Sequence, residues 1–593
     1  MRANWLAMDI VAERVARWGI ETQYRDGLGQ HRIVAPEVLA RLVEIFSASG
    51  EPSAPRAPPT GDVQLAYQCG DTAPERMWGL AVQLYGVRSR RNWGHGDFTD
   101  LANLIELAAS LGASGIGLNP LHALFDDLAD AYSPYSPNSR LFLNSHYIDP
   151  ERISEFPGLE AAGLTDKVAA LRRAELVDYA GVIEAKTRAF TLCYSAFRDN
   201  GTTLRKQDFA RFRESGGDTL VRFSCFEFLR RKFAGPWWTW PDEWRTPDDG
   251  RLAALRISQD EAIGLYEFLQ WAADSQLRAC RERAATLGLP IGLYLDIAVG
   301  VRADGFDAWN EQDVFDRALD IGAPPDRLNL EGQRWGLAGI NPVALERREC
   351  RPFAHMLRAS MQYAGAIRLD HVLGLKRLYL IPKEMRAAQG AYVRLPFESL
   401  LKVVSQESRA NLCLVIGEDL GTVPDGFRET LAQWGIWSYQ VMMFQRADDG
   451  GFIAPDHYSR NALVTFATHD LPTFAGWMSG QDLSVKRALG MDPGETEEDR
   501  TAAHDALRAA MRWRRLERLD YPSVTKFLAE TPSRFLAVSA EDALGLVDQV
   551  NVPGTTAEYP NWRRRLPIDL EDLRDLPLLA SLAELLLAAG RRS

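Results

Sequence analysis

The chain has 593 residues, of which 46% are hydrophobic and 25% are charged. These fractions are typical of a folded globular protein and exclude long disordered stretches, and the length predicts one large domain with smaller pieces attached. The 68 Lys and Arg residues against 80 Asp and Glu residues give a formal net charge of −12. This acidic balance argues against nucleic acid and membrane surfaces as partners.

The six cysteines form no CxxC pair, which is typical of reduced, scattered thiols rather than a disulfide framework or a zinc site. The first residues, MRANWLAMDIVAERVARWG, contain charges throughout and lack the apolar run of a signal peptide. The most apolar stretch, 576–589, is too short to cross a bilayer. We therefore expect a cytoplasmic protein.

Residues 1–49 are expected to form a small helical N-terminal module, with an apolar stripe over 38–46. Residues 50–74 follow, and four prolines with Gly and Ser within 50–62 predict that they form a linker. The remaining residues, 75–593, contain the pattern of the large domain.

This domain shows a series of short apolar runs, each ending in polar residues, with helical patterns such as 97–112 between several of them. Such alternation predicts an α/β protein with a (β/α)₈ TIM barrel. Residues 150–285 are mostly helical in pattern and predict an insertion at the C-terminal mouth, where barrel enzymes build active sites. The apolar runs begin at Trp78, Ser114, Pro290, Gly365, Leu412, Ser438, Ala462 and Arg534.

Three of the predicted strands end in acids, at Asp370, Glu418 and Asp470. In a barrel, polar residues at these ends point into the active site, and buried carboxylates are costly unless they have partners or a use. Cleavage of a glycosidic bond needs two carboxyl groups, one protonated and one ionised. The three acids are therefore the candidates for catalysis.

The neighbours of these acids suggest different roles. Arg368 lies two residues before Asp370 and faces the same side of the strand, so we expect it to lower the pKa of Asp370, as suits a nucleophile. Burial, together with the adjacent charge of Asp419, is expected to raise the pKa of Glu418, as suits a general acid. Asp470, after His469, is a candidate for binding sugar hydroxyls.

Several loops are rich in aromatic and turn residues. The segment 131–140 alternates Tyr, Ser and Pro, and predicts a rigid loop with exposed rings and hydroxyls. The four Trp residues of 235–244 are expected to pack within the helical region rather than to bind sugar. The Gly-rich segment 331–342 suggests a mobile flap. The loop after the third strand could bring Asp304 near the cleft, whereas Asp296 is expected to support the barrel.

The motifs SPYSPNSR, DIAVGVRADGFDAW, GQRWG, IRLDH, IGEDLGTVP and ATHDLPT follow one another between Trp78 and Leu566. In this order they resemble the amylomaltases, the 4-α-glucanotransferases of glycoside hydrolase family 77, and in particular the enterobacterial type with a shortened N-terminal region. The resemblance implies retaining transfer through a covalent intermediate on Asp370, with Glu418 as acid/base and Asp470 as transition-state stabiliser. It also implies sugar contacts from Tyr135, Asp304, Trp335, Arg368, His371 and His469.

The resemblance further implies that the partners are maltooligosaccharides, glucose and starch or glycogen-type glucans, with no metal and no organic cofactor, in a monomer or homodimer. The residues by themselves leave open a hydrolase of the α-amylase type, which uses the same three acids, and a catalytically inactive glucan-binding protein. A phosphate-handling barrel is disfavoured, because no Gly-rich phosphate cradle precedes a late helix.

Overall fold

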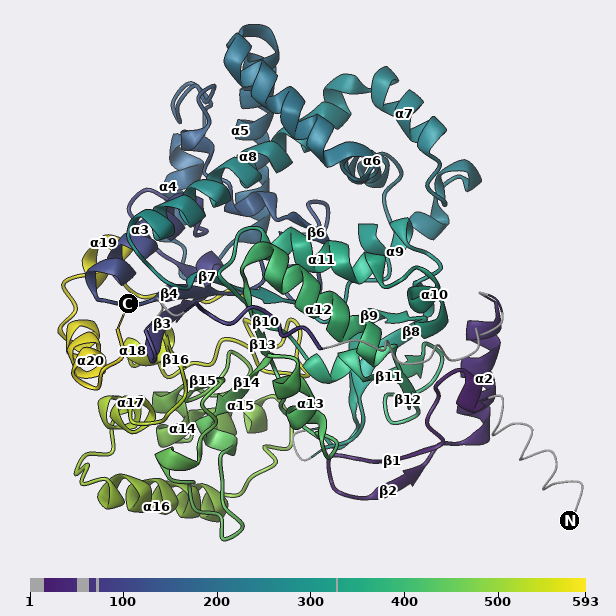
Figure 1. Cartoon of the computed structure of the whole chain (residues 1–593). Helices are drawn as coiled ribbons and strands as arrows, with labels where there is room; N and C mark the ends of the chain where they lie inside the picture. Colours follow the sequence, from purple (N-terminus) through teal and green to yellow (C-terminus); the bar gives the residue numbers. More distant parts are fainter. Residues whose placement is uncertain (1–14, 49, 51–62, 71–73, 327–328, 593) are drawn as a thin grey trace, which may run out of the picture.

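A closed barrel of eight parallel strands forms the centre of the molecule (Figure 1). The computed structural model describes all residues except 1–14, 49, 51–62, 71–73, 327–328 and 593. Each strand pairs with the strand before it and the strand after it in the chain, and the last pairs with the first, which confirms the predicted (β/α)₈ barrel. The strands are β3 (Met77–Val82), β4 (Gly115–Leu118), β7 (Gly292–Ile297), β10 (Ala366–Leu369), β13 (Leu414–Gly417), β14 (Trp437–Val441), β15 (Ala462–Thr465) and β16 (Phe535–Ser539).

The barrel strands are apolar because they are covered on both sides. Every residue of β4, β10, β13 and β15 is buried, as expected where helices cover a parallel sheet. The barrel closes where Phe535 of β16 lies beside Met77 of β3. Helices that alternate with these strands along the chain include α3 (Phe98–Ser110), α8 (Asp260–Thr286), α11 (Arg351–Met361), α12 (Phe397–Asn411), α13 (Phe427–Gln433) and α17 (Tyr521–Ala529), and α20 (Pro577–Ala588) follows the last strand.

Local signals explain where helices begin. Helix α3 starts with a capping box in which Asp97 and Asp100 exchange hydrogen bonds with each other's backbone. The other helices of the barrel region are α9 (Phe306–Asn310), α10 (Pro342–Arg347), α14 (Phe474–Ser479), α15 (Gln481–Ala488), α16 (Glu497–Trp513), α18 (Ala540–Ala543) and α19 (Leu570–Leu573).

A group of helices lies between β4 and β7 in the chain and above the barrel in Figure 1. It comprises α4 (Thr165–Arg173), α5 (Tyr179–Asn200), α6 (Thr203–Phe233), α7 (Asp249–Ser258) and the long α8, and it follows the short hairpin of β5 (His122–Ala123) and β6 (Ser139–Leu143). Helix α6 is broken at Gly217, where φ is 50°. Trp237 and Trp240 are buried in a core with Phe226, so these two rings pack within the helical region, as predicted.

A second sheet lies beside the barrel and is antiparallel, in the order β12-β11-β8-β9. Its strands are β8 (Phe315–Ala323), β9 (Gln333–Ile340), β11 (Arg377–Pro382) and β12 (Ala391–Arg394). The segment in which we expected a mobile flap is therefore mostly strand β9, which is hydrogen-bonded to β8. The glycines had suggested a loop, whereas 333–340 is an extended strand; the mobility of this segment stays a prediction.

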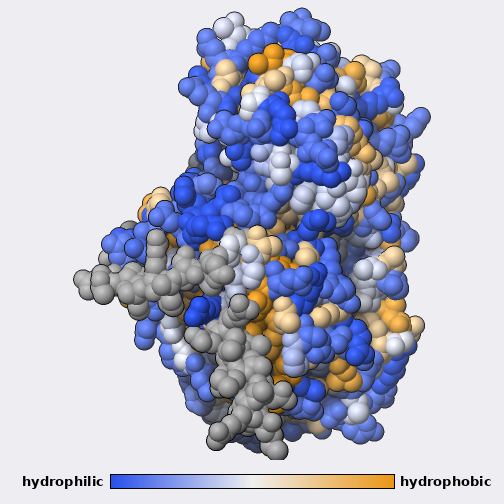
Figure 2. All heavy atoms as spheres, turned by 90° about the vertical axis from the view of Figure 1, so that its right-hand side faces the viewer, coloured by the Kyte–Doolittle hydropathy of each residue, from blue (hydrophilic) through white to orange (hydrophobic). Residues whose placement is uncertain are grey.

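The N-terminal module is not purely helical. Its described part holds a hairpin of β1 (Gln23–Arg25) and β2 (His31–Ile33) followed by α2 (Pro36–Ser47). The module is attached to the antiparallel sheet: the Glu21 N–H donates to the Tyr392 carbonyl at 2.8 Å, and the hydroxyls of Tyr24 and Tyr379 are 3.2 Å apart. The face that carries α2 is mostly hydrophilic, with hydrophobic side chains interspersed (Figure 2).

Much of the predicted linker, 51–62 and 71–73, lies outside the described residues. The part between them is bound to the barrel helices, because the Ala66 N–H donates to the Trp434 carbonyl at 2.8 Å and the Tyr67 N–H to Ser408 Oγ at 2.8 Å.

Arg591, just after α20, is fully buried at the end of the barrel where the strands begin. Its guanidinium donates to the carbonyls of Met77 at 3.1 Å and Ser533 at 2.8 Å, next to the paired β3 and β16, and to the carbonyl of Thr531 at 3.0 Å. Throughout the described ranges, each helix is too short or too polar to span a lipid bilayer.

Candidate active site

The three candidate acids follow strands at the carboxyl end of the barrel. Asp370 comes directly after β10, Glu418 directly after β13, and Asp470 in the loop after β15. Strands β10 and β13 are neighbours with Leu369 opposite Gly417, so Asp370 and Glu418 occupy equivalent positions on adjacent strands. The Glu418 carboxylate accepts the His371 N–H at 2.9 Å, which places it beside the backbone next to Asp370.

Arg368 binds two carboxylates at once. Its Nη1 lies 2.9 Å from both oxygens of Asp296 and 2.9 Å from Oδ1 of Asp370. The guanidinium also lies over the ring of Tyr439, 5.5 Å from the centroid. Asp296 is therefore more than a barrel support, because it positions the arginine that contacts Asp370.

Burial raises the pKa of both acids on the adjacent strands. Burial raises the pKa of Glu418 to about 7, with Arg368 opposing and the charge of Asp370 adding to the rise. Burial also raises the pKa of Asp370, although Arg368 opposes it, so our expectation of a lowered pKa was wrong. Because Asp370 has the direct ion pair with Arg368, we assign the ionised form to Asp370 and the proton to Glu418.

Asp419 does not act on Glu418 as we expected. Its carboxylate accepts hydrogen bonds from Arg428 at 2.8 Å, from Ser438 Oγ at 2.7 Å and from the Tyr439 N–H at 3.1 Å. Its charge is thus compensated by Arg428, and burial with Asp370 accounts for the raised pKa of Glu418.

Asp470 is the most exposed of the three acids, with 46% of its side chain accessible. Asn551 Nδ2 donates to its Oδ1 at 2.6 Å, and His469 Nε2 is 3.5 Å from its Oδ2. Partial burial acts to raise the pKa of Asp470, but His469 and Asn551 outweigh this and hold it below its ordinary value. Asp470 is therefore ionised at neutral pH.

Tyr135 and His469 lie together with Trp562. The rings of Tyr135 and His469 stack at 4.7 Å, and Trp562 lies 5.3 Å from Tyr135 and 5.4 Å from His469. The Tyr135 hydroxyl donates to Asp296 at 2.6 Å. The loop at 131–140 is thereby attached to the Arg368 network.

His371 has a left-handed backbone with φ of 47°, and its ring lies 5.2 Å from the ring of Trp335 on β9 in an edge-to-face arrangement. Burial, and then the charge of Arg368, lowers the pKa of His371 to about 4. This imidazole is therefore neutral at pH 7.

Asp304 is held elsewhere. Arg302 donates to both of its oxygens at 2.9 and 3.1 Å, and Arg230 of α6 lies 3.5 Å away. Within the described part of the chain, no hydrogen bond or ion pair connects Asp304 to another candidate residue. The structure brings the other eight candidates together and leaves Asp304 in this separate ion-pair cluster.

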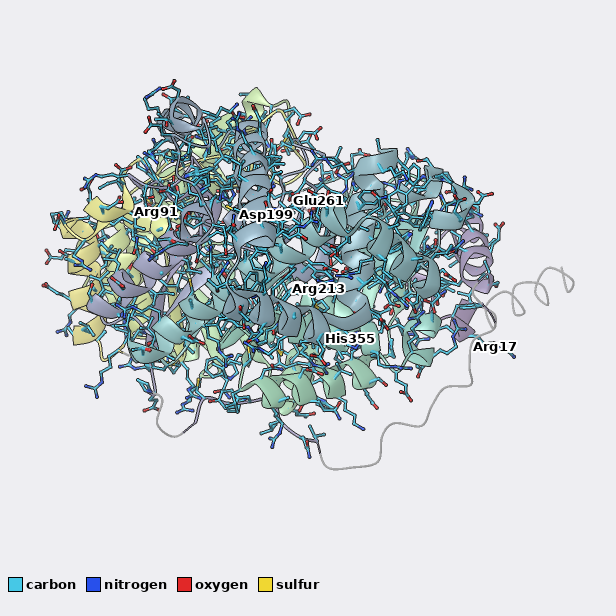
Figure 3. All side chains as sticks on the ribbon, turned by 90° about the horizontal axis from the view of Figure 1, so that it is seen from above. Arg17, Arg91, Asp199, Arg213, Glu261 and His355 are labelled. Atoms are coloured by element: carbon cyan, nitrogen blue, oxygen red, sulfur yellow. The ribbon has the colours of Figure 1, made fainter. Side chains whose placement is uncertain are left out.

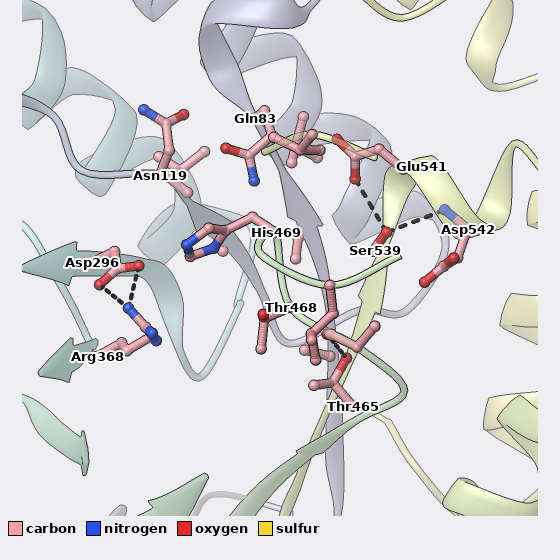
Figure 4. Close-up of a pocket in the computed structure, with 18 of the residues that line it drawn as sticks. Gln83, Asn119, Asp296, Arg368, Thr465, Thr468, His469, Ser539, Glu541 and Asp542 are labelled. Carbon is pink, nitrogen blue, oxygen red and sulfur yellow. Dashed lines mark hydrogen bonds and ion pairs between the residues drawn. The ribbon is translucent and has the colours of Figure 1, made fainter. Parts of the chain in front are cut away.

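A cavity of 90 Å³ lies inside the barrel next to the site (Figure 4). Tyr135, Asp296, Arg368 and His469 line it on one side, and Glu541 and Asp542 line it on the other. Asp370 and Glu418 do not line it, so the cavity lies beneath the catalytic candidates. Where the structure is described, no group of three or more His, Cys, Asp or Glu side chains is arranged to hold a metal ion.

Sequence reasoning gave no role in the site to four residues that the structure joins to it. Asn551 and Trp562 lie in the stretch from Trp78 to Leu566 over which the resemblance runs, and this offered a signal. Tyr439 offered no sequence signal, because it is an ordinary strand residue. Asp296 was noticed as a strand-end acid, but its link to Arg368 comes from the pairing of β7 with β10.

The family model of the 4-alpha-glucanotransferases of glycoside hydrolase family 77 matches residues 82–570. A 4-alpha-glucanotransferase of Haemophilus influenzae is 35% identical over 547 residues, covering 85% of this chain and 77% of that protein. A 4-alpha-glucanotransferase of Mycobacterium tuberculosis is 35% identical over 551 residues, covering 87% and 76%.

Solved structures give the same picture of the fold. The crystal structure of amylomaltase from Corynebacterium glutamicum superposes with a TM-score of 0.82 at 26% identity, over 99% of this chain and 100% of that one. Amylomaltase from Streptococcus agalactiae, solved in complex with acarbose, superposes with a TM-score of 0.73 at 21% identity, over 87% and 100%.

Proposed function

The chain belongs to the 4-alpha-glucanotransferases of glycoside hydrolase family 77, a retaining family that acts by double displacement, and from this premise we propose which side chains perform each step. Asp370 is the nucleophile, Glu418 the general acid and base, and Asp470 the stabiliser of the transition state. The observation that supports this assignment is the ion pair with Arg368, which contacts Asp370 at 2.9 Å, whereas burial raises the pKa of Glu418 to about 7.

In the first step, protonated Glu418 donates its proton to the glycosidic oxygen while a carboxylate oxygen of Asp370 attacks the anomeric carbon. The bond to the leaving glucan breaks and a β-linked glucosyl ester forms on Asp370. In the second step, the Glu418 carboxylate takes the proton of an incoming 4-hydroxyl, whose oxygen displaces Asp370 and rebuilds an α-1,4 bond. This sequence requires the two carboxyl groups to lie about 5 Å apart.

Asp470 has a different role in this proposal, which is to bind sugar hydroxyls. Asn551 and His469 keep it ionised, and its exposed carboxylate can accept hydrogen bonds from sugar hydroxyls that strengthen as the ring flattens. Tyr135, Trp335, Arg368, His371 and His469 surround the sugar in this proposal. Asp304 would join them only if its ion pairs with Arg302 and Arg230 open, so we place it at the edge of the site.

The proposed substrates are maltooligosaccharides and starch or glycogen-type glucans as donors, with glucose or another maltooligosaccharide as acceptor. The acarbose complex of the Streptococcus agalactiae amylomaltase supports this class. Transfer outcompetes hydrolysis when a bound acceptor is positioned against the intermediate, because positioning supplies a large effective molarity.

Incubation with maltotriose tests the reaction. A transferase gives a ladder of longer oligosaccharides plus glucose with no net gain of reducing ends. Asp370→Asn should abolish the ladder, and Asp456→Asn, which changes an exposed aspartate, should leave it intact. A steady gain of reducing ends with only shorter products would identify a hydrolase instead.

Reaction of variants with an activated α-glucosyl fluoride in the presence of azide distinguishes the nucleophile from the general acid and base. In Asp370→Gly, azide occupies the place of the nucleophile and should give the β-glucosyl azide. In Glu418→Ala, azide attacks the ester on Asp370 and should give the α-glucosyl azide. The opposite stereochemistry would exchange the two assignments.

A further inference from the structure

The carboxyl group of Glu418 accepts two backbone hydrogen bonds, one on each oxygen. The His371 N–H donates to Oε2 at 2.9 Å, and the Leu420 N–H donates to Oε1 at 2.8 Å. Each oxygen keeps a second lone-pair site, so the carboxyl group can still carry the proton that the first step requires. The direction in which this acid points therefore depends on where the two N–H groups are held.

The Leu420 N–H is not held by regular secondary structure, because 418–424 contains neither helix nor strand. The peptide unit between Asp419 and Leu420 is instead bound by Arg428 of α13, whose Nη2 donates to the Asp419 carbonyl at 2.9 Å. Arg428 Nε donates at the same time to Oδ2 of Asp419 at 2.8 Å. One guanidinium thus binds both the backbone and the side chain of Asp419, and it fixes the peptide whose N–H reaches Glu418.

Asp419 also joins this peptide to strand β14. The paired residues of β13 and β14 end where Gly417 lies opposite Ser438. Beyond that point the Asp419 carboxylate accepts hydrogen bonds from Ser438 Oγ at 2.7 Å and from the Tyr439 N–H at 3.1 Å, and so continues the connection between the two strands. The ring centroid of Tyr439 lies 5.5 Å from the guanidinium of Arg368, so the same carboxylate also fixes a residue that packs on the Arg368 network.

We propose that Asp419 is the positioning residue of the general acid: through the Leu420 N–H it holds the Glu418 carboxyl group in the direction needed for proton transfer. Only 1% of Asp419 is exposed, so it does not itself contact a sugar. It acts on Glu418 through geometry rather than through its charge, which Arg428 compensates. Geometry matters here because a general acid must lie within hydrogen-bond distance of the atom that it protonates.

The inference rests on the proposed role of Glu418, and a comparison of two reactions tests the two proposals separately. Transfer from maltotriose needs the acid in the first step and the base in the second. The reaction of α-glucosyl fluoride with azide needs neither, because fluoride leaves without taking a proton and azide attacks without losing one. A misplaced Glu418 carboxyl group therefore slows only the maltotriose reaction, whereas a general structural defect slows both reactions.

Asp419→Asn replaces one acceptor oxygen with an amide group that cannot accept the same donors. We expect kcat for maltotriose transfer to fall at least about tenfold, and at most by the roughly 100- to 10,000-fold that general acid–base catalysis contributes, with KM unchanged. The rate of fluoride release in the presence of azide should stay close to that of wild type. Ser438→Ala covers the case in which Asp419→Asn does not fold, because it removes only the hydrogen bond from Ser438 Oγ. It should show a smaller loss that is also confined to maltotriose transfer.

Asp199→Asn is the matched control, because Asp199 is an exposed aspartate near the end of α5 in the helical insertion (Figure 3). It should keep both rates. Glu418→Ala is the reference for the catalytic role. If Glu418→Ala slows both reactions alike, the assignment of the general acid is wrong and the inference about Asp419 is overturned with it. If Glu418→Ala slows only maltotriose transfer, while Asp419→Asn and Ser438→Ala slow both reactions or neither, the inference about Asp419 alone is overturned.

Discussion

The hydrogen bond from Asn551 to Asp470, at 2.6 Å, is the contact through which the C-terminal segment acts on the catalytic centre. A hydrogen bond to a charged group contributes about 1.5–3 kcal/mol. Asn551→Ala should therefore reduce kcat/KM for maltotriose transfer roughly 10- to 150-fold, with a small change in Tm because Asp470 is half-exposed. The matched control is Asn461→Ala, because Asn461 is exposed, whereas Asn561 is buried. Asn461→Ala should leave kcat/KM unchanged. Equal kcat/KM in Asn551→Ala and wild type would remove Asn551 from the site.

The pKa of Glu418 sets the pH range of the reaction. Burial raises it to about 7, so the acid form needed in the first step is present below that pH and is lost as the pH rises through it. In a profile of kcat/KM between pH 5 and 9, the descending limb should have its midpoint near 7. A descending limb beginning near pH 5 would mean that Glu418 is solvated in the working enzyme.

For individual residues, the sequence predicted which acids follow strands but not which side chains those acids contact. Asp370, Glu418 and Asp470 follow apolar runs, and Arg368 shares a face with Asp370, so these could be found from spacing. The predicted pKa direction of Asp370 was wrong because burial raises this pKa more than Arg368 lowers it, and the charge of Asp296, from another strand, adds to the rise. Asn551 lies 81 residues from Asp470, and local pattern does not encode such a pairing.

Among the elements, all eight barrel strands were found because most are apolar runs of the kind that two-sided burial demands, although β14 contains Ser438 and Gln440. The hairpin of β1 and β2 was missed, since its three-residue strands are mostly exposed. Strand β9 was not predicted as a strand because its glycines suggest a loop. Gly339 there packs so closely on Leu319 that a Cβ would lie 2.4 Å from it, which explains a glycine inside a strand.

Helix α6 offers a test of how the insertion supports the site. Asn138, which lies in the loop that carries Tyr135, donates a hydrogen bond to Glu227 at 2.7 Å. Burial, and then the charge of Asp126, raises the pKa of Glu227 to about 8. The folded state therefore keeps a proton that the unfolded chain releases at its lower, ordinary pKa, and stability falls as the pH rises through this window, by about 1.4 kcal/mol per pKa unit.

Glu227→Gln keeps the acceptor oxygen but cannot ionise. Its Tm should fall less than that of wild type between pH 5 and pH 8, measured by thermal unfolding. Glu214→Gln, at an exposed position of the same helix, should follow the wild-type curve. Parallel curves for Glu227→Gln and wild type would show that Glu227 is solvated or paired with a cation in solution.

For the molecule as a whole, Arg591 joins the first and last strands of the barrel. Its guanidinium satisfies carbonyls beside both β3 and β16, and each buried acceptor left unsatisfied costs about 1–3 kcal/mol. Arg591→Gln should therefore lower Tm while KM for maltotriose stays the same, because the catalytic centre is at the opposite end. Arg592→Gln, at an exposed neighbour, should change neither quantity, and an unaltered Tm for Arg591→Gln would refute the joining role.

The pairing of β3 with β16 also means that β3 remains without one of its partner strands during synthesis. Met77 and its partner Phe535 are separated by about 460 residues, which a ribosome adds in roughly 25–90 s at about 5–20 residues per second. During that interval β4 can cover one edge of β3, but the other edge has no permanent neighbour, and an open edge strand can pair with another chain. The yield of this protein during synthesis should therefore depend on how well that edge is shielded until the last strand emerges.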